Sequence, residues 1–141
     1  MRSPNCWHPT SSFTPPLTSR LRFEGKQEVT ALHRDIFAVL DGLTTTEPLA
    51  LGDTGSFSFR ARVRGVELEA MNLVRCNKHG QIVDYTVFVR PLPALATLFA
   101  ALPPRVSVRR RGRLKGTLAA TLARPLAFAI RTADRFVPAF L

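Results

Sequence analysis

The sequence has little of what disulfide scaffolds and metal sites require. Its 141 residues contain two cysteines, Cys6 and Cys76, and three scattered histidines, His8, His33 and His79. Two cysteines are too few for a disulfide framework, which suits the reducing cytoplasm, and no two histidines have the spacing of paired ligands on one helix face. Catalytic triad orderings and phosphate-binding loops are also missing. We therefore expect no metal and no cofactor.

Long apolar runs are missing as well. The first 16 residues, MRSPNCWHPTSSFTPP, lack the apolar stretch of about 7 to 15 residues that a signal peptide needs. The longest uncharged stretch of the C-terminal region, Gly116 to Ala123, is far shorter than the roughly 20 apolar residues of a membrane helix. Arginine outnumbers lysine 17 to 3, which is typical of a GC-rich bacterial genome. We expect a bacterial, cytoplasmic protein.

Acidic residues are nearly missing from the C-terminal part. Residues 105–141 hold nine Lys and Arg against one acid, Asp134, a net charge of 9 − 1 = +8, whereas residues 1–104 hold 11 against 9, a net charge of +2. A basic cluster predicts contact with an anionic membrane surface or an acidic partner; packing of the tail on the domain with solvated arginines is the alternative. Residues 105–127 lack aromatic side chains, so we do not expect specific nucleic-acid binding. The cluster consists of Arg109, Arg110, Arg111, Arg113 and Lys115.

The chain divides into four parts with one domain. Residues 1–20, rich in Pro, Ser and Thr, predict an irregular lead-in with at most one short strand. Residues 21–104 form the domain; residues 105–115 form a basic linker; and residues 116–141 form a helical extension that Pro125 splits. Within the domain, apolar residues at helical spacing after Lys26 predict an amphipathic helix that Asp41-Gly42 ends, and Leu92 to Leu102 predicts a second one. His33, beside Arg34 and Asp35, is expected on the solvated side of the first helix, with a role as a ligand as the alternative.

Three strands are predicted between these helices. Alternation places Phe57, Phe59, Ala61 and Val63 on one face. A two-residue turn at Arg64-Gly65 pairs Val63 with Val66 and sets Arg62 opposite Glu67 and Arg60 opposite Glu69, so opposite charges support the register. A second turn at residues 77–80 then sets Val74 opposite Asp84, Asn72 opposite Thr86, and Ala70 opposite Phe88, which gathers Asn72, Asp84 and Thr86 on the apolar face.

Three segments carry a family resemblance: Phe23 and Gly25 before the first helix, GVELE at residues 65–69, and GQIVDYTVFVRPL at residues 80–92. From Pro16 to Leu102 the chain resembles the SnoaL-like branch of the nuclear transport factor 2-like superfamily. The resemblance implies an α+β cone, in which a curved antiparallel sheet wraps round helices and encloses an apolar pocket. Relatives include isomerases and cyclases that move protons with carboxylates. This sequence departs from its relatives at two points. Asn72 stands where many relatives have a carboxylate. The helices that normally begin the domain are missing or replaced, so the cone is expected to be incomplete at its N-terminus.

These observations predict a protein that binds a small apolar ligand and has isomerase, cyclase or dehydratase chemistry. Asp84 is the candidate acid or base, because burial raises the pKa of a carboxyl; hydrogen bonding near the hairpin mouth is its alternative role. The ligand-binding candidates are Phe57, Phe59, Asn72, Thr86 and Phe88. The outer sheet face predicts a homodimer interface made of Met71, Leu73, Tyr85, Val87 and Val89, with cover by the C-terminal helices as the alternative. The alternative function is a non-catalytic binding or assembly module whose basic tail docks on a membrane or an acidic partner.

Overall fold

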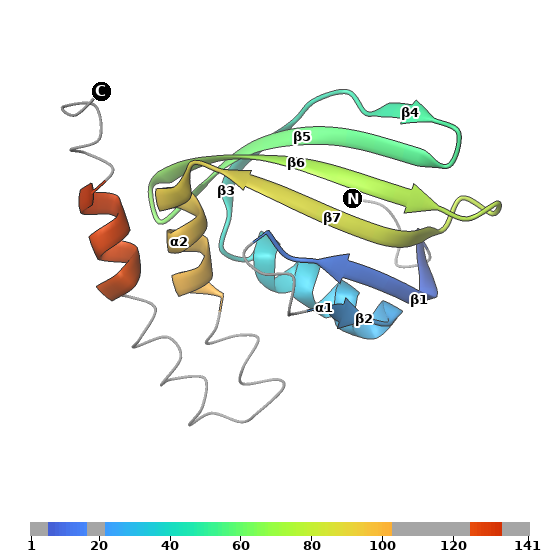
Figure 1. Cartoon of the computed structure of the whole chain (residues 1–141), viewed down its shortest axis with the longest axis horizontal. Helices are drawn as coiled ribbons and strands as arrows, with labels where there is room; N and C mark the ends of the chain where they lie inside the picture. Colours follow the sequence, from blue (N-terminus) through green and yellow to red (C-terminus); the bar gives the residue numbers. More distant parts are fainter. Residues whose placement is uncertain (1–5, 17–21, 103–124, 134–141) are drawn as a thin grey trace.

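The computed structural model describes residues 6–16, 22–102 and 125–133. In these ranges one mixed sheet has the strand order β2-β1-β7-β6-β5-β3, with β4 paired to the start of β5. The elements are β1 (Trp7–Thr14), β2 (Phe23–Glu24), α1 (Lys26–Phe37), β3 (Asp41–Thr45), β4 (Leu49–Leu51), β5 (Thr54–Val63), β6 (Val66–Cys76), β7 (Ile82–Arg90) and α2 (Leu92–Ala101). Figure 1 shows β5, β6 and β7 arching over α1 and α2, so the sheet has an inner face toward the helices and an outer face away from them. The predicted α+β cone is confirmed.

The pairing of β5 with β6 follows the predicted register at every position. Val63 pairs with Val66 across a turn in which Arg64 and Gly65 both have positive φ, as a two-residue hairpin of this type requires. On the outer face Arg62 and Glu67 form an ion pair of 3.0 Å. Alternation therefore fixed this hairpin, because a shift by one residue would have exposed its apolar side chains and buried its charges.

Within residues 1–20, for which the sequence predicts at most one short strand, residues 7–14 form an eight-residue strand of the sheet. β1 pairs in parallel with β7 and in antiparallel fashion with β2, so the sheet is mixed rather than wholly antiparallel. Trp7, Ser11 and Phe13 are its buried residues, and the register with β7 shifts between Trp7 and Ser12. That irregularity, in a segment rich in Pro, Ser and Thr, hides the strand from a search for strict alternation.

α1 begins as expected and ends earlier than expected. Gly25, with φ of 89°, precedes the helix and donates its amide hydrogen to the carbonyl of Ser11 over 2.8 Å, which ties the helix start to β1. The helix ends at Phe37, and Asp41-Gly42, expected to close it, instead opens β3. Residues 125–133, the described part of the C-terminal region, are helical. The predicted basic linker, residues 105–115, lies outside the described residues.

The core consists of two clusters on the inner face. The α2 cluster joins α2 to β5 and β6, and its buried members are Ala61, Val63, Leu68, Ala70, Ala94, Leu98, Ala101 and Leu102. The α1 cluster joins α1 to β1, β2, β6 and β7, and its buried members are Trp7, Phe13, Phe23, Val29, Leu32, Val74 and Tyr85. Each helix thus covers one end of the inner face, and the space between the two clusters becomes the candidate site.

The fully buried Val63 tests the α2 cluster. We expect Val63→Ala to lower the free energy of unfolding by about 2 kcal/mol, because the substitution removes two methyl groups and leaves a void. Urea denaturation measures the change. The neighbouring outer-face change Arg62→Ala should cost less than about 0.5 kcal/mol, because an exposed ion pair contributes little. Equal losses in the two variants would contradict this placement of the core.

Candidate functional site

β7 carries one residue more than the segment of β6 that it faces. Cys76 faces Ile82, as predicted, but the next residue of β6, Arg75, faces Asp84. Val83 is therefore left without a partner in β6 and forms a β-bulge. Past this bulge every residue of β7 is displaced by one position from the predicted register.

The displacement reverses the two faces of β7, because successive side chains of a strand point to opposite sides. Asn72 now pairs with Val87 instead of Thr86, and Val74 pairs with Tyr85 instead of Asp84. The prediction that Asp84, Thr86 and Phe88 share the inner face with Asn72 is therefore wrong. The prediction that Tyr85, Val87 and Val89 belong to an outer dimer face is wrong for the same reason.

A cavity of about 280 Å³ lies between the α1 and α2 clusters, under the inner face. Its lining comes from β1, β2, α1, β5, β6, β7 and α2 and the segments beside them, so both helices and the sheet shape it. The lining residues are Phe13, Pro15, Pro16, Phe23, Leu32, His33, Ile36, Phe37, Leu40, Phe59, Leu68, Asn72, Tyr85, Val87, Val89, Leu98, Phe99 and Leu102. The polar side chains among them are His33, Asn72 and Tyr85, and none is a carboxylate.

Asn72 and Tyr85 form a buried hydrogen-bonded pair in the cavity wall. The Tyr85 hydroxyl donates to Oδ1 of Asn72 over 2.9 Å, and Nδ2 of Asn72 donates to the carbonyl of Phe57 over 3.2 Å. Asn72 is fully buried and Tyr85 is 8% exposed. Burial raises the pKa of the Tyr85 phenol, so this hydroxyl stays protonated and acts as a donor. The amide can make a further hydrogen bond, because Nδ2 carries two hydrogens.

His33 projects from α1 into a group of aromatic rings. Its ring centroid lies 4.8 Å from that of Trp7, 5.2 Å from that of Phe13 and 5.0 Å from that of Tyr85. Nδ1 lies 2.9 Å from the carbonyl oxygen of Val29, one turn earlier in the helix. Desolvation by burial lowers the pKa of the imidazole, an effect that the hydrogen bond to Val29 partly offsets. His33 is therefore held neutral at pH 7.

The expectation that His33 is solvated is wrong. It was judged from its neighbours Arg34 and Asp35, although helix faces are set by residues three and four positions apart. Val29 lies four residues before His33 and Phe37 four residues after it, which places His33 on the apolar stripe. The spacing of four residues from Val29 and Phe37 is the signal that would have identified this residue.

Asp84 lies on the outer face, near the hairpin mouth. Its Oδ1 accepts a hydrogen bond of 2.5 Å from the Ser12 hydroxyl and lies 3.6 Å from a guanidinium nitrogen of Arg22. Asp84 does not line the cavity. The alternative role considered for this carboxylate, hydrogen bonding near the hairpin, matches these contacts, although the partner is Ser12 rather than Asn72 or Thr86. Of the predicted ligand-binding residues, Phe59 and Asn72 line the cavity, and Phe57 packs behind it against Tyr85 at 6.5 Å.

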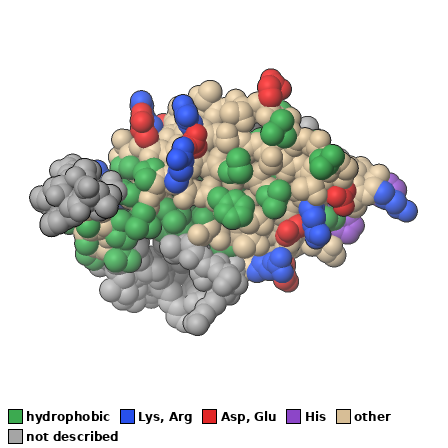
Figure 2. Space-filling view, turned by 45° about the horizontal axis from the view of Figure 1, so that its top comes forward, with side chains coloured by type: hydrophobic (Ala, Val, Ile, Leu, Met, Phe, Trp, Pro, Cys, Tyr) green, Lys and Arg blue, Asp and Glu red, His purple; other side chains and the backbone are tan. Residues whose placement is uncertain are grey.

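The outer face carries an apolar patch between charged groups (Figure 2). We call Met71, Leu73 and Phe88 the outer patch; their exposed fractions are 56%, 43% and 57%. Met71 and Phe88 are direct cross-strand partners, and Leu73 follows Met71 on the same side of β6. Met71 and Leu73 lie on the outer face, as predicted. Phe88 lies there in place of Tyr85, Val87 and Val89, which the bulge turns to the inner face.

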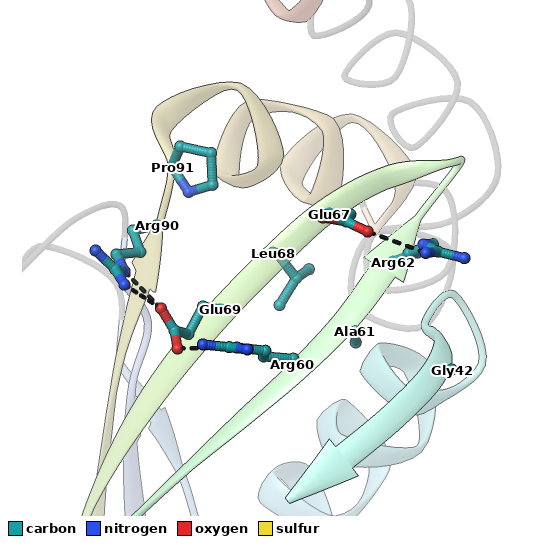
Figure 3. Close-up of a pocket in the computed structure, with 9 residues that line it drawn as sticks. All are labelled: Gly42, Arg60, Ala61, Arg62, Glu67, Leu68, Glu69, Arg90 and Pro91. Carbon is teal, nitrogen blue, oxygen red and sulfur yellow. Dashed lines mark hydrogen bonds and ion pairs between the residues drawn. The ribbon is translucent and has the colours of Figure 1, made fainter.

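A groove at one end of the outer face contains charges that are already paired. Figure 3 shows Glu69 between Arg60 and Arg90, and Glu67 beside Arg62. Nε of Arg60 donates to Oε1 of Glu69 over 3.2 Å, and Nε of Arg90 donates to Oε2 over 2.7 Å. Hydrogen bonds from Arg90 first, and then from Arg60, hold the pKa of the Glu69 carboxyl below its usual range. A carboxylate stabilised in its charged form by two guanidinium groups is a poor proton acceptor, so we do not place chemistry in this groove.

Metal sites and membrane spans are both missing from the described ranges. No group of three or more His, Cys, Asp or Glu side chains that could hold a metal ion occurs there. None of the described helices combines the length and apolar character needed to cross a membrane. The predicted membrane or partner contacts, Arg109 to Arg111, Arg113 and Lys115, fall outside the described residues.

The neutral, partly buried His33 predicts a pH dependence of stability. Its pKa is lowered in the folded chain, so below about pH 6.5 the unfolded chain binds a proton that the folded chain resists. Stability should therefore fall as the pH drops from 7.5 to 5, and His33→Gln should remove part of that fall. The group that faces the imidazole from β7 is Tyr85, which is uncharged. On the neighbouring strands His8 contacts Thr10 and Glu24 is exposed to solvent. No charge facing His33 therefore reverses the expected fall of stability at low pH. Urea denaturation at pH 7.5 and pH 5 measures the change in the free energy of unfolding. His79→Gln, at an exposed turn, is the control. If stability falls as much in His33→Gln as in the wild type, the lowered pKa of His33 is contradicted.

Comparison of the sequence with models of known protein families finds no match, and none of the curated proteins matches significantly. Solved structures do match. A steroid delta-isomerase from Pseudomonas aeruginosa is 27% identical, with a TM-score of 0.70 over 75% of this chain and 78% of that one. An uncharacterized protein with a cystatin-like fold from Silicibacter pomeroyi is 22% identical, with a TM-score of 0.71 over 82% of this chain and 81% of that one.

A third structure carries the superfamily name. It is an NTF2-like protein of unknown function from Burkholderia xenovorans, 14% identical, with a TM-score of 0.54 over 61% of this chain and 66% of that one. These likenesses are likenesses of overall fold, in agreement with the α+β architecture and its curved sheet. They agree with the resemblance predicted from the sequence at the level of the fold: the chain has the fold of nuclear transport factor 2-like proteins.

Proposed function

We propose that this chain is an isomerase-type protein that binds a small, largely apolar molecule with one carbonyl or hydroxyl group in the cavity between α1 and α2. The observation that carries the proposal is the Asn72–Tyr85 pair, a buried hydrogen-bonded pair in a largely apolar wall whose other described polar side chain is His33. A few placed polar groups in an apolar lining are typical of small-molecule sites. If positions 72 and 85 served only to pack the core, apolar side chains would avoid the desolvation cost of burying an amide and a phenol.

The pair has hydrogen-bonding capacity left for a ligand. Nδ2 of Asn72 donates one hydrogen bond to the carbonyl oxygen of Phe57, and its second hydrogen can be donated to a ligand oxygen. The Tyr85 oxygen donates to Asn72 and retains a lone pair, which can accept from a ligand hydroxyl. Each such bond contributes about 0.5 to 1.5 kcal/mol, enough to favour a ketone over its hydrocarbon several-fold.

The cavity volume limits the size of the ligand. A cavity of about 150 Å³ holds benzene, and this one has about 280 Å³. We therefore propose a molecule of one or two rings. A neutral ligand fits best, because the described lining offers no charged side chain to an ion. The likeness to a steroid delta-isomerase, at 27% sequence identity over the matched part, supports the isomerase class, but the cavity volume argues for a smaller substrate here.

We further propose that two copies of the chain associate through the outer patch. Met71, Leu73 and Phe88 are contiguous, large and apolar, and all three are more than 40% exposed. A sheet face that carries such side chains among charged groups is typical of an interface. A two-fold arrangement would bring the patch of one copy against the same patch of the other.

A cavity-filling substitution tests ligand binding. We expect the wild type to bind the bicyclic ketone 2-tetralone more tightly than tetralin, and Val87→Phe to weaken the binding of both at least tenfold, because the added ring takes up cavity volume. Fluorescence of Trp7, the single tryptophan, reports binding, since its ring lies 5.7 Å from that of Tyr85. The control is Thr86→Val, the next residue along β7, on the outer face.

The titration has clear contradicting results. Val87→Phe must first show a cooperative urea transition like that of the wild type. If this folded variant binds 2-tetralone as tightly as the wild type, the ligand is not in the cavity. If the wild type binds neither compound in the millimolar range by fluorescence or calorimetry, the proposed function is wrong.

A charge in the outer patch tests the dimer. The wild type should be dimeric by light scattering coupled to size-exclusion chromatography, and Met71→Arg should be monomeric, because it places like charges at the centre of the interface. Lys78→Glu, on the exposed turn between β6 and β7, should remain dimeric. A monomeric wild type at micromolar concentration, or a dimeric Met71→Arg variant, would contradict the interface.

A further inference from the structure

The cavity lacks the carboxylate that proton transfer in this superfamily would lead one to expect. Its described lining holds two titratable side chains, His33 and Tyr85. Tyr85 is protonated and already donates to Asn72, so it cannot accept a proton at neutral pH. Position 72 is an amide, which cannot act as a base, and Asp84 is on the other face of the sheet. One proton acceptor, the imidazole of His33, is left.

The hydrogen bond to Val29 determines which nitrogen of His33 is available. A carbonyl oxygen only accepts, so the nitrogen 2.9 Å away, Nδ1, must carry the hydrogen. In the neutral ring the lone pair then resides on Nε2. Nδ1 points back toward the backbone of α1, and Nε2 is on the opposite side of the five-membered ring. Within the described part of the chain, Nε2 has no hydrogen-bond partner.

Three aromatic side chains fix the plane of this imidazole. Phe13 and Tyr85 meet it edge to face, at interplanar angles of 84° and 88°, and Trp7 is tilted against it at 51°. Side-chain packing and the Val29 hydrogen bond together restrict both rotations of the His33 side chain. Such pre-orientation is what a general base requires, because proton transfer depends on geometry before it depends on pKa.

We propose that Nε2 of His33 is the general base of this site and removes a proton from the carbon next to the ligand's carbonyl group. The C–H bond breaks, its electron pair moves into the carbon–carbon bond and onto oxygen to give an enolate, and the proton forms an N–H bond at Nε2. The second hydrogen of Asn72 Nδ2 hydrogen-bonds to the enolate oxygen. Return of the proton from the imidazolium to a carbon of the ligand completes an isomerisation, with no oxidant or co-reactant. This inference rests on the proposed function.

Deuterium exchange into 2-tetralone tests the base directly. In D₂O, proton NMR follows loss of the hydrogens next to the carbonyl, and we expect the wild type to accelerate it above the buffer rate. His33→Gln should lose at least a hundredfold of this acceleration, the usual contribution of a general base. His79→Gln and Asp84→Asn should retain it, because both residues lie away from the cavity. Added imidazole should restore part of the rate in His33→Ala.

A pH profile adds a result that a structural role would not give. The exchange rate should rise with pH through one ionisation below that of free histidine and then stay level, because the base must be neutral. The groups that face His33 do not add a second step in this range, since Tyr85 stays protonated and His8 and Glu24 make no contact with its ring. In His33→Gln this step should be missing.

The outcomes separate the inference from the proposed function. If the wild type binds 2-tetralone by Trp7 fluorescence but does not accelerate exchange, the base assignment is overturned and the binding proposal stands. If a His33→Gln variant that still binds 2-tetralone exchanges as fast as the wild type, the assignment is likewise overturned. If the wild type does not bind the ketone, both fall.

Discussion

A single unpaired residue in β7 decides which of its side chains line the cavity. Val83 bulges out of the ladder with β6, and every later side chain of the strand changes face. The inner face thereby receives Tyr85, Val87 and Val89, and the outer face receives Asp84, Thr86 and Phe88. Without the bulge a carboxylate would be buried among apolar residues; with it, the cavity wall holds a phenol and an amide that satisfy each other.

This arrangement keeps the cavity free of net charge. Burying a charge without a partner is costly, and each polar group in the wall avoids that cost in its own way. Tyr85 and Asn72 pair with each other, and His33 is neutral because burial disfavours the imidazolium and Val29 accepts its hydrogen. The charged residues of the sheet are on the outer face, where Glu69 pairs with arginines and Asp84 with Ser12 and Arg22. The two faces therefore suit the two proposed tasks, ligand binding inside and association outside.

Much of the fold could be predicted from the sequence, and the failures have physical causes. The β5–β6 register was predictable because alternation and two ion pairs agree on it. The β7 register was not, because its sequence IVDYTVFVR offers apolar side chains to both faces, so either register buries a similar surface. β1 was missed because its alternation is interrupted, and His33 because its sequence neighbours are charged although its neighbours on the helix face are apolar. Asn72 and Phe59 were identified correctly as inner-face residues, since their hairpin was correct.

The bulge is tested most directly by nuclear Overhauser effects from the side-chain amide hydrogens of Asn72. The account predicts strong effects to the ring hydrogens of Tyr85 and to the methyl groups of Val87, its inner-face neighbours on β7. Effects to the side chains of Asp84 and Thr86 in their place would show an unbroken register and would contradict the account.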